Sequence, residues 1–349
     1  MIRARRKEMV IVAGLALVLA VPVMLAINDN RFMQHVLFMI FLFAALAGGW
    51  NILGGYGGQL SLGHASFFGI GAYTSTLLLI NYGVSPWFGM LIAIGIATVA
   101  SFVIGIPTFR LKGPFFALAT IAVGEVLRIC ALEWRSITHG ANGLVVSTPF
   151  GLKYMMFHSK LAYVGLAFVL MLMVICIARR LENSKLGYCL LAVRENESAA
   201  EALGVNITKT KMVALVISGC ITAVCGVVYA QYVWYIEPGS VFSNAFSVQI
   251  TLTAIIGGLT TVWGPIIGAV FLIPLGEILR VYLGGGGHGI YLMIYGVLLI
   301  AVVRMLPKGI ISILDRLPKG ILSILDRLPK GILSILDRSN DNTDARGGS

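Results

Sequence analysis

The segment Met9–Ile27, with the sequence MVIVAGLALVLAVPVMLAI, runs for 19 residues without a charged side chain. That is about the length of a helix that crosses the hydrocarbon core of a bilayer. Similar segments recur along the chain of 349 residues, of which 58% are hydrophobic and 12% are charged, whereas soluble domains carry about 25% charged residues. The composition excludes a soluble enzyme and predicts an all-α, polytopic integral membrane helix bundle.

The apolar segments predict about ten spans, at residues 9–27, 32–53, 62–80, 86–106, 113–130, 160–178, 212–233, 246–262, 265–283 and 288–303. No A-x-A site closes the first segment, so a retained helix is favoured over a cleaved signal peptide. If the basic stretch before it is cytoplasmic, most of the 26 Lys and Arg residues fall in cytoplasmic segments, and both termini are cytoplasmic. The net charge of +11 therefore reports orientation in the lipid bilayer, with no nucleic-acid partner.

Two glycine-rich interruptions lie inside the apolar regions, one between residues 54 and 71 and one between residues 256 and 265. Such a segment is tolerated inside a bundle or beside a water-filled cavity, but not facing lipid. Close packing of helices at small residues is the alternative explanation. Because one interruption falls in each half of the chain, we favour a translocation path built from broken helices. The predicted helix breaks or hinges are Gly57, Gly58, Gly63, Gly257 and Gly258.

Polar residues interleaved with the first group of glycines are the candidates for lining such a path. An anionic group of a substrate could lie against the N-terminus of a half-helix in this segment. A packing role for His64 is nevertheless favoured over proton transfer. The predicted substrate path consists of Gln59, Ser61, His64, Ser66 and Tyr73.

The chain also contains a weak internal repeat. Gly-Pro at position 113 is followed by Glu125 and Arg128, and Gly-Pro at position 264 is followed by Glu277 and Arg280. Each acid and base are three residues apart, so each pair can meet on one face of a helix. At a membrane boundary, such a pair mainly offsets its own desolvation, although gating or docking is an alternative role.

We expect residues 1–305 to form the membrane domain, with residues 179–211 as its cytoplasmic loop. Within this loop, composition predicts a short helix over 195–203 that ends at Gly204. Residues 306–338 are three amphipathic 11-residue repeats, each opening with Leu-Pro-Lys-Gly, and are predicted to lie on the cytoplasmic leaflet as a tolerated tail. Residues 339–349 are predicted to be disordered.

Four motifs, in order along residues 30–305, resemble the branched-chain amino acid permease family of ABC importers. They are GGQLSLGHASFFGIGAY at 57–73, FFALAT at 115–120, HGANGL at 139–144 and RENESAA at 194–200. Residues 198–204 are also similar to the EAA-loop pattern of importer permeases, with Ser198 in place of the glutamate. Within the family, the chain most resembles the larger permease subunit.

The resemblance implies a multi-pass protein of the bacterial inner membrane that imports leucine, isoleucine and valine. It implies a second permease, two cytoplasmic ATPase subunits and an extracytoplasmic substrate-binding protein as partners. ATP and Mg²⁺ would be bound by the ATPases, so no cofactor is expected in this chain. The residues expected to couple to the ATPases are Glu195, Glu197, Ala199, Ala200, Glu201 and Gly204. Related permeases carry urea or short amides, which remain alternative substrates.

No enzymatic or metal-binding motif is recognisable in the sequence. The segment 58–65 has two glycines at Walker A spacing but lacks the Lys and Ser/Thr that hold phosphate and Mg²⁺. No HExxH, GxSxG or paired Cys/His spacing occurs, so no catalytic residue and no metal ligand is predicted. A secondary transporter or channel that works without ATPases is the main alternative, although such proteins require ionisable groups near the bilayer midplane.

Overall fold

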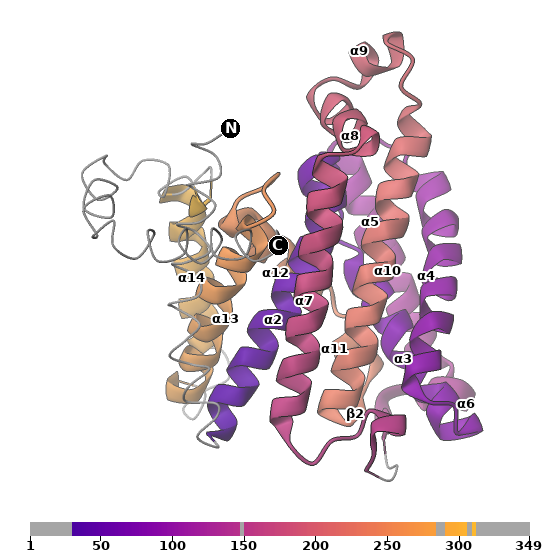
Figure 1. Ribbon diagram of the computed structural model, residues 1–349, viewed down its shortest axis with the longest axis vertical. Helices are drawn as coiled ribbons and strands as arrows, with labels where there is room; N and C mark the ends of the chain where they lie inside the picture. Colours follow the sequence, from indigo (N-terminus) through magenta and orange to yellow (C-terminus); the bar gives the residue numbers. More distant parts are fainter. Residues whose placement is uncertain (1–29, 147–149, 284–289, 306–308, 312–349) are drawn as a thin grey trace, which may run out of the picture. The chain divides into compact units, whose positions relative to one another are not determined.

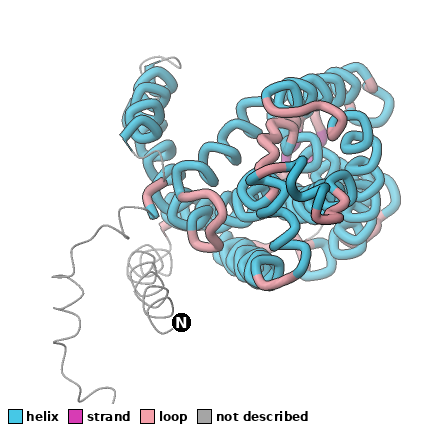
Figure 2. The backbone as a smooth tube through the Cα atoms, turned by 90° about the horizontal axis from the view of Figure 1, so that it is seen from above, coloured by secondary structure: helices cyan, strands magenta, loops and turns pink. Residues whose placement is uncertain are grey.

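A computed structural model describes residues 30–146, 150–283, 290–305 and 309–311 of the chain. The described chain is almost entirely helical, and most of its long helices run side by side in one bundle (Figures 1 and 2). This confirms the predicted all-α membrane architecture. The helices are α2 (Arg31–Asn51), α3 (His64–Tyr82), α4 (Pro86–Thr108), α5 (Pro114–Glu133), α6 (Arg135–Thr138), α7 (Lys160–Glu182), α8 (Lys185–Glu195), α9 (Glu197–Ala202), α10 (Ile207–Val233), α11 (Pro238–Val241), α12 (Asn244–Gly257), α13 (Gly264–Leu283) and α14 (Ile290–Met305).

Seven helical segments of the described chain are long and apolar enough to cross a membrane. They are Arg31–Tyr56, Pro86–Thr108, Pro114–Glu133, Lys160–Glu182, Ile207–Val233, Pro238–Gly257 and Gly264–Tyr282. Helices α3 and α14 correspond to two further predicted spans, at 62–80 and 288–303, but do not belong to these seven. The predicted span 9–27 lies outside the described residues. Within the described residues, seven helical segments thus meet this criterion, and the predicted count of about ten stays a prediction.

The centre of the bundle is the segment Arg31–Tyr56, whose apolar stretch is 94% buried. Beside it, α3 and α10 approach each other so closely that glycine is required at their contact. A Cβ atom on Gly71 would lie 2.0 Å from the carbonyl oxygen of Ala223, and one on Gly226 would lie 2.1 Å from the carbonyl oxygen of Phe68. Small residues thus set the helix spacing here.

The two ends of the bundle differ. Helices α8 and α9 cap one end, whereas α6 and the short strand β2 lie at the other (Figure 1). At that second end, β1 (Leu144–Val145) pairs with β2 (Tyr235–Ile236) in an antiparallel arrangement. This pairing fixes the loop between α5 and α7 to the chain that follows α10.

Both halves of the predicted internal repeat begin helices, α5 at Pro114 and α13 at Gly264. The predicted ion pairs are present in both: Arg128 donates to Glu125, with Nε 3.0 Å from Oε2, and Arg280 Nη1 lies 3.3 Å from Glu277 Oε1. Of the tail repeats at 306–338, only residues 309–311 are described, and the Ile310 amide donates to the carbonyl oxygen of Ile256 at 2.8 Å. Residues 339–349 lie outside the described residues.

Candidate functional site

The first predicted interruption is a break between two helices. Helix α2 continues through a π-helical turn, Ile52–Tyr56, and the chain then leaves helical geometry until α3 begins at His64. Gly58 has a φ of 66°, a left-handed conformation that glycine adopts without strain. Gly57, Gly58 and Gly63 thus lie in the non-helical segment, and α3 begins two residues later than the predicted span.

Side chains from α2 itself and from two other helices, α5 and α12, satisfy backbone polar groups that the break leaves without helical partners. Ser61 and Ala65 are buried, so a missing bond at either residue would cost free energy. The bonds are Trp50 Nε1 to the Ser61 carbonyl at 2.7 Å, the Leu62 amide to Thr120 Oγ1 at 3.0 Å, and the Ala65 amide to Ser247 Oγ at 2.7 Å. None of the three was predicted from the sequence: Thr120 and Ser247 lie 58 and 182 positions from their partners, and nothing local marks Trp50 as a donor to Ser61.

His64 connects the break to α10. The side chain is fully buried, with Nδ1 3.1 Å from Ser61 Oγ and Nε2 2.7 Å from Ser218 Oγ. Both ring nitrogens are thus occupied by hydroxyl groups, an arrangement that fixes the ring and the start of α3. This geometry fits a positioning role for His64.

The N-terminus of α3 lies inside the bundle and faces a small cavity. The cavity is bordered by Ser61, Ser66 and Thr120, and the space available to water is about 10 Å³, enough for about one molecule. The hydroxyl of Ser66 is buried and has no hydrogen-bond partner among the described residues. A free hydroxyl beside a helix N-terminus suits a polar or anionic group, but this conformation has no room for a substrate.

The other two predicted path residues are placed differently. The amide of Gln59 is buried and donates to the carbonyl oxygen of Gly57 at 3.4 Å. Tyr73 is nine residues beyond His64 on α3, or about 13 Å along the helix axis, and its buried hydroxyl has no partner among the described residues. The structure thus brings Ser61, His64 and Ser66 together and leaves Tyr73 apart from them.

The second predicted break separates α12 from α13 and adjoins the first. Gly258 has a φ of 130° and Thr260 a φ of 60°. The side chain of Asn51, at the end of α2, donates to the Thr261 carbonyl at 3.0 Å and accepts from the Thr260 amide at 3.3 Å. Asn51 therefore joins the two breaks. Its position just before a run of glycines was the only sequence signal for this role.

The cytoplasmic loop differs from its predicted form. The helix predicted over 195–203 is wrong in its boundaries, because α8 ends at Glu195 and α9 covers Glu197–Ala202. Asn196 separates them in an extended conformation (φ −159°, ψ 110°), and its side chain accepts from the Ala199 amide at 3.1 Å. An asparagine N-cap thus starts a new helix here. Gly204 follows α9 with a φ of 84°, at the predicted stop.

Helix α8 packs directly on the first break. A Cβ atom on Gly57 would lie 3.3 Å from Leu190 Cδ2, and one on Gly58 would lie 2.8 Å from Arg194 Cγ. Leu190 is fully buried. The backbone of the break and one face of α8 are therefore in van der Waals contact, with no space for a larger residue at Gly58.

Helix α9 is tied to α10 by an ion pair. Lys211 Nζ lies 2.6 Å from Glu197 Oε1, and the side chains are 2% and 29% exposed respectively. The methyl group of Ala200 is buried beneath α9. On the opposite side, the coupling candidates Ala199 and Glu201 are exposed, together with Leu203.

This ion pair allows a stability prediction. We expect Glu197→Ala to lower the free energy of unfolding by about 3 kcal/mol, because it leaves the buried ammonium of Lys211 without a counter-charge. Lys211→Met should cost less, since the remaining carboxylate is partly hydrated. The double variant should recover most of the loss. Thermal unfolding in detergent measures all three, and equal losses in the two single variants would contradict the proposed burial.

An open groove of about 640 Å³ separates α9 from the turn between α4 and α5. Arg110 and Lys112 line one part of it, and Glu197 and Glu201 line another. Charges of both signs therefore lie beside the exposed leucine and alanine of α9. Such a surface has the polar rim and apolar centre that protein interfaces use.

Comparison with known proteins places this architecture in one family. Residues 32–303 match the family described as the branched-chain amino acid transport system, permease component. The chain belongs to this family. A high-affinity branched-chain amino acid transport system permease protein, LivM of Escherichia coli K12, is 27% identical over 88% of this chain and 75% of its own.

More distant relatives extend the range of named solutes. A probable branched-chain amino acid transport permease, LivH of Methanocaldococcus jannaschii, is 25% identical over 70% of this chain and 80% of its own. The autoinducer 2 import system permease LsrC of Enterobacter sp. strain 638 is 27% identical over 58% of this chain and 59% of its own. The family and the seven apolar helices confirm the predicted multi-pass permease of the inner membrane.

Proposed function

We propose that this permease moves branched-chain amino acids into the cytoplasm, driven by ATP hydrolysis in two separate ATPase subunits. A second permease subunit would complete the path, and an extracytoplasmic binding protein would deliver the substrate. The observation that carries this proposal is the direct packing of α8 on the glycine break, through Leu190 and Arg194. A force on the loop between α7 and α10 has a short route to the interrupted helix.

The proposed motion is a change between two packings of the same helices. ATPases bound to α9 would displace this helix. Helix α10 would move with it, because the ion pair between Lys211 and Glu197 joins the two helices. The break at Gly57 and Gly58 would absorb the change in backbone angles, and the small cavity at the start of α3 would widen. Because the free energy comes from ATP in another chain, this subunit needs no catalytic residue.

Co-purification tests the composition of the complex. The chain carrying an affinity tag, expressed in its own cells, should bring down two ATPase subunits and a second permease. In proteoliposomes containing the complex, uptake of labelled leucine should require ATP inside and binding protein outside. Uptake driven by an ion gradient alone, with no ATPase recovered, would support the secondary transporter instead.

A matched pair of serines tests the path at the start of α3. Ser66 and Ser75 both have buried hydroxyls without partners among the described residues, but only Ser66 borders the cavity. We expect Ser66→Ala to raise the KM for leucine uptake about tenfold, the cost of one hydrogen bond to a charged group. Ser75→Ala should leave the KM unchanged. Equal KM values in the two variants would show that Ser66 does not contribute to the substrate path.

A second solute class is favoured by one finding, the similarity to an autoinducer 2 permease. Selectivity can reside in the binding protein, so the permease could carry another small polar solute. Competition of labelled leucine uptake by unlabelled valine, urea, acetamide and autoinducer 2 separates these alternatives. Inhibition by valine alone supports branched-chain amino acids.

A further inference from the structure

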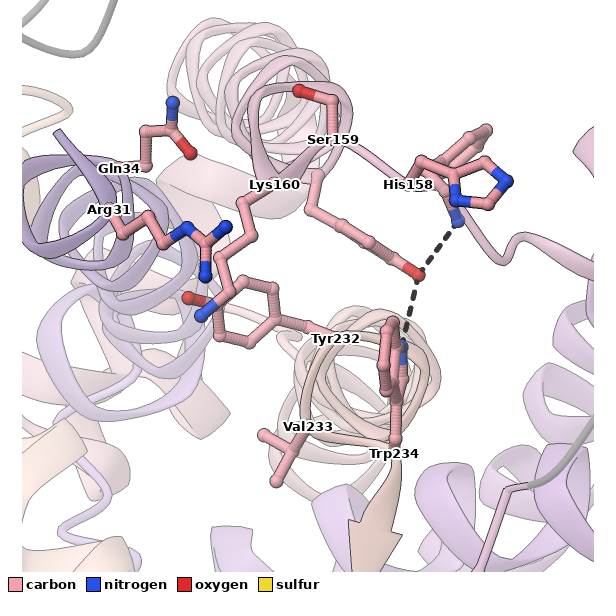
Figure 3. A pocket seen from close by; sticks show the side chains of 10 residues that line it. Arg31, Gln34, His158, Ser159, Lys160, Tyr232, Val233 and Trp234 are labelled. Carbon is pink, nitrogen blue, oxygen red and sulfur yellow. Dashed lines mark hydrogen bonds between the residues drawn. The ribbon is translucent and has the colours of Figure 1, made fainter. Parts of the chain in front are cut away.

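A pocket of about 620 Å³ opens at the end of the bundle opposite α9, where α2 and α7 begin and α10 ends. Its walls carry aromatic side chains, including Tyr163, Tyr232 and Trp234. Figure 3 shows Arg31 and Lys160 extending toward the same region beside the hydroxyl of Tyr232. The ammonium of Lys160 also lies over the Tyr232 ring, 5.6 Å from its centroid.

The electrostatics of this pocket are unusual. Arg31 is the first residue of α2 and Lys160 is the first residue of α7, and neither helix has an acid in its first turn. The N-terminus of a helix is already positive, so a cation there is unfavourable. Neither cation forms an ion pair within the described part of the chain. Two helix ends and two cations thus face one space, and no carboxylate of the described residues pairs with either cation.

Among the charged groups that the structure describes, Glu277 does not supply that counter-charge. Glu277 is held by Arg280, with Oε1 and Nη1 3.3 Å apart, and its second oxygen lies 3.9 Å from His35 Nε2. The other ring nitrogen of His35 lies 2.8 Å from the Tyr232 hydroxyl. The carboxylate of Glu277 is therefore engaged on the far side of His35. An anion from outside the chain would complete the pocket.

An apolar stripe on α7 begins directly beside Lys160. Its residues recur at helical spacing and are all exposed: Leu161, Gly165, Phe168, Leu172 and Cys176. The stripe follows a membrane-spanning helix into the hydrocarbon region, while the pocket lies at its end, where aromatic and basic residues mark the lipid headgroup layer. The pattern is a cationic headgroup site continued by a surface for an acyl chain.

We infer that this pocket binds the phosphodiester headgroup of an anionic phospholipid, with one acyl chain along the exposed stripe of α7. Arg31 and Lys160 bind the phosphate, since guanidinium and ammonium groups both pair with phosphate oxygens. The bound lipid neutralises two helix N-termini and fills the space between α2, α7 and α10. This site is independent of the substrate path and of the ATPases.

Lipid retained by the purified chain tests the inference. The full chain is purified in mild detergent, supplied with equal amounts of dioleoyl phosphatidylglycerol and dioleoyl phosphatidylcholine, and analysed by native mass spectrometry. We expect phosphatidylglycerol to be retained preferentially. Arg31→Gln with Lys160→Gln should weaken its binding about thirtyfold, corresponding to ~1 kcal/mol for each basic side chain. A matched control, Arg135→Gln with Lys153→Gln, removes two exposed cations elsewhere and should change nothing.

Two further measurements separate a lipid from a free anion. Leu172 lies in the stripe but distant from the cations, and Leu172→Gln should also lower phosphatidylglycerol retention. Inorganic phosphate at 10 mM (on the order of cellular levels) should not displace the lipid, because phosphate lacks the acyl contact. If phosphate displaces the lipid and Leu172→Gln leaves retention unchanged, the ligand of this pocket is a free phosphate and not a phospholipid. Equal retention in the Arg31/Lys160 variant and the control, with unchanged melting temperatures, would overturn the inference.

Discussion

Replacing Gly71 by alanine is expected to destabilise the permease by about 3 kcal/mol or more, although alanine is the better helix former. The added Cβ would lie 2.0 Å from the carbonyl oxygen of Ala223, a backbone atom that moves only if α3 and α10 separate. Overpacking of this kind costs about 1–3 kcal/mol where side chains can adjust, and here they cannot. The melting temperature of the purified protein in detergent measures the loss.

Gly95 on α4 provides the matched control. A Cβ at this position meets no atom within 4 Å, so Gly95→Ala should stabilise the helix by up to about 1 kcal/mol and leave the melting temperature unchanged or raised. Gly226→Ala, on the facing helix, should behave like Gly71→Ala. If Gly71→Ala and Gly95→Ala melt together, the close approach of α3 and α10 is incorrect.

The second large effect is expected at Leu203, which is 84% exposed beside α9. Leu203→Asp removes apolar surface from the proposed ATPase contact without disturbing the packed interior. We expect the amount of ATPase that co-purifies, and ATP-dependent leucine uptake, to fall about tenfold or more, since burial of one leucine is worth about 1.5–3 kcal/mol. The melting temperature of the isolated permease should not change.

Leu152→Asp is the control for this variant. Leu152 is also exposed, at 71%, but it lies before the start of α7, whereas α8 and α9 follow the end of that membrane-spanning helix. It should retain the ATPases fully. A Leu203→Asp protein that keeps its ATPases and transports normally would place the coupling contact elsewhere in the chain, and would remove the main support for the proposed role of α9.

The sequence predicted most helices because apolar length is a local property. The segment 86–106 became α4 at Pro86–Thr108, and 160–178 became α7 at Lys160–Glu182. The breaks were also predictable, since glycine disfavours a helix wherever it lies. Boundaries in the polar loop were less accurate, because a single N-cap at Asn196 decides where α8 ends and α9 begins.

The partners of the breaks could not be predicted in the same way. Asn51 bonds to residues more than 200 positions away, and Ser218 is 154 positions from His64. No pattern within either segment encodes such a contact. Lys211 is the last residue of the predicted cytoplasmic loop, yet its side chain is 2% exposed, since α10 begins earlier than the predicted span. Burial of a single lysine depends on tertiary packing alone.

In the proposed coupling, the division of the cytoplasmic loop by Asn196 would give one docking partner two separate points of action. Displacement of α9 would reach α10 through Lys211, while displacement of α8 would reach Gly57 and Gly58. Variants that remove the first connection should impair the movement of α10, and variants that remove the second should prevent the cavity at the start of α3 from widening. Neighbouring residues of this loop would then give kinetic defects of two distinct kinds, which single-turnover measurements of transport should separate.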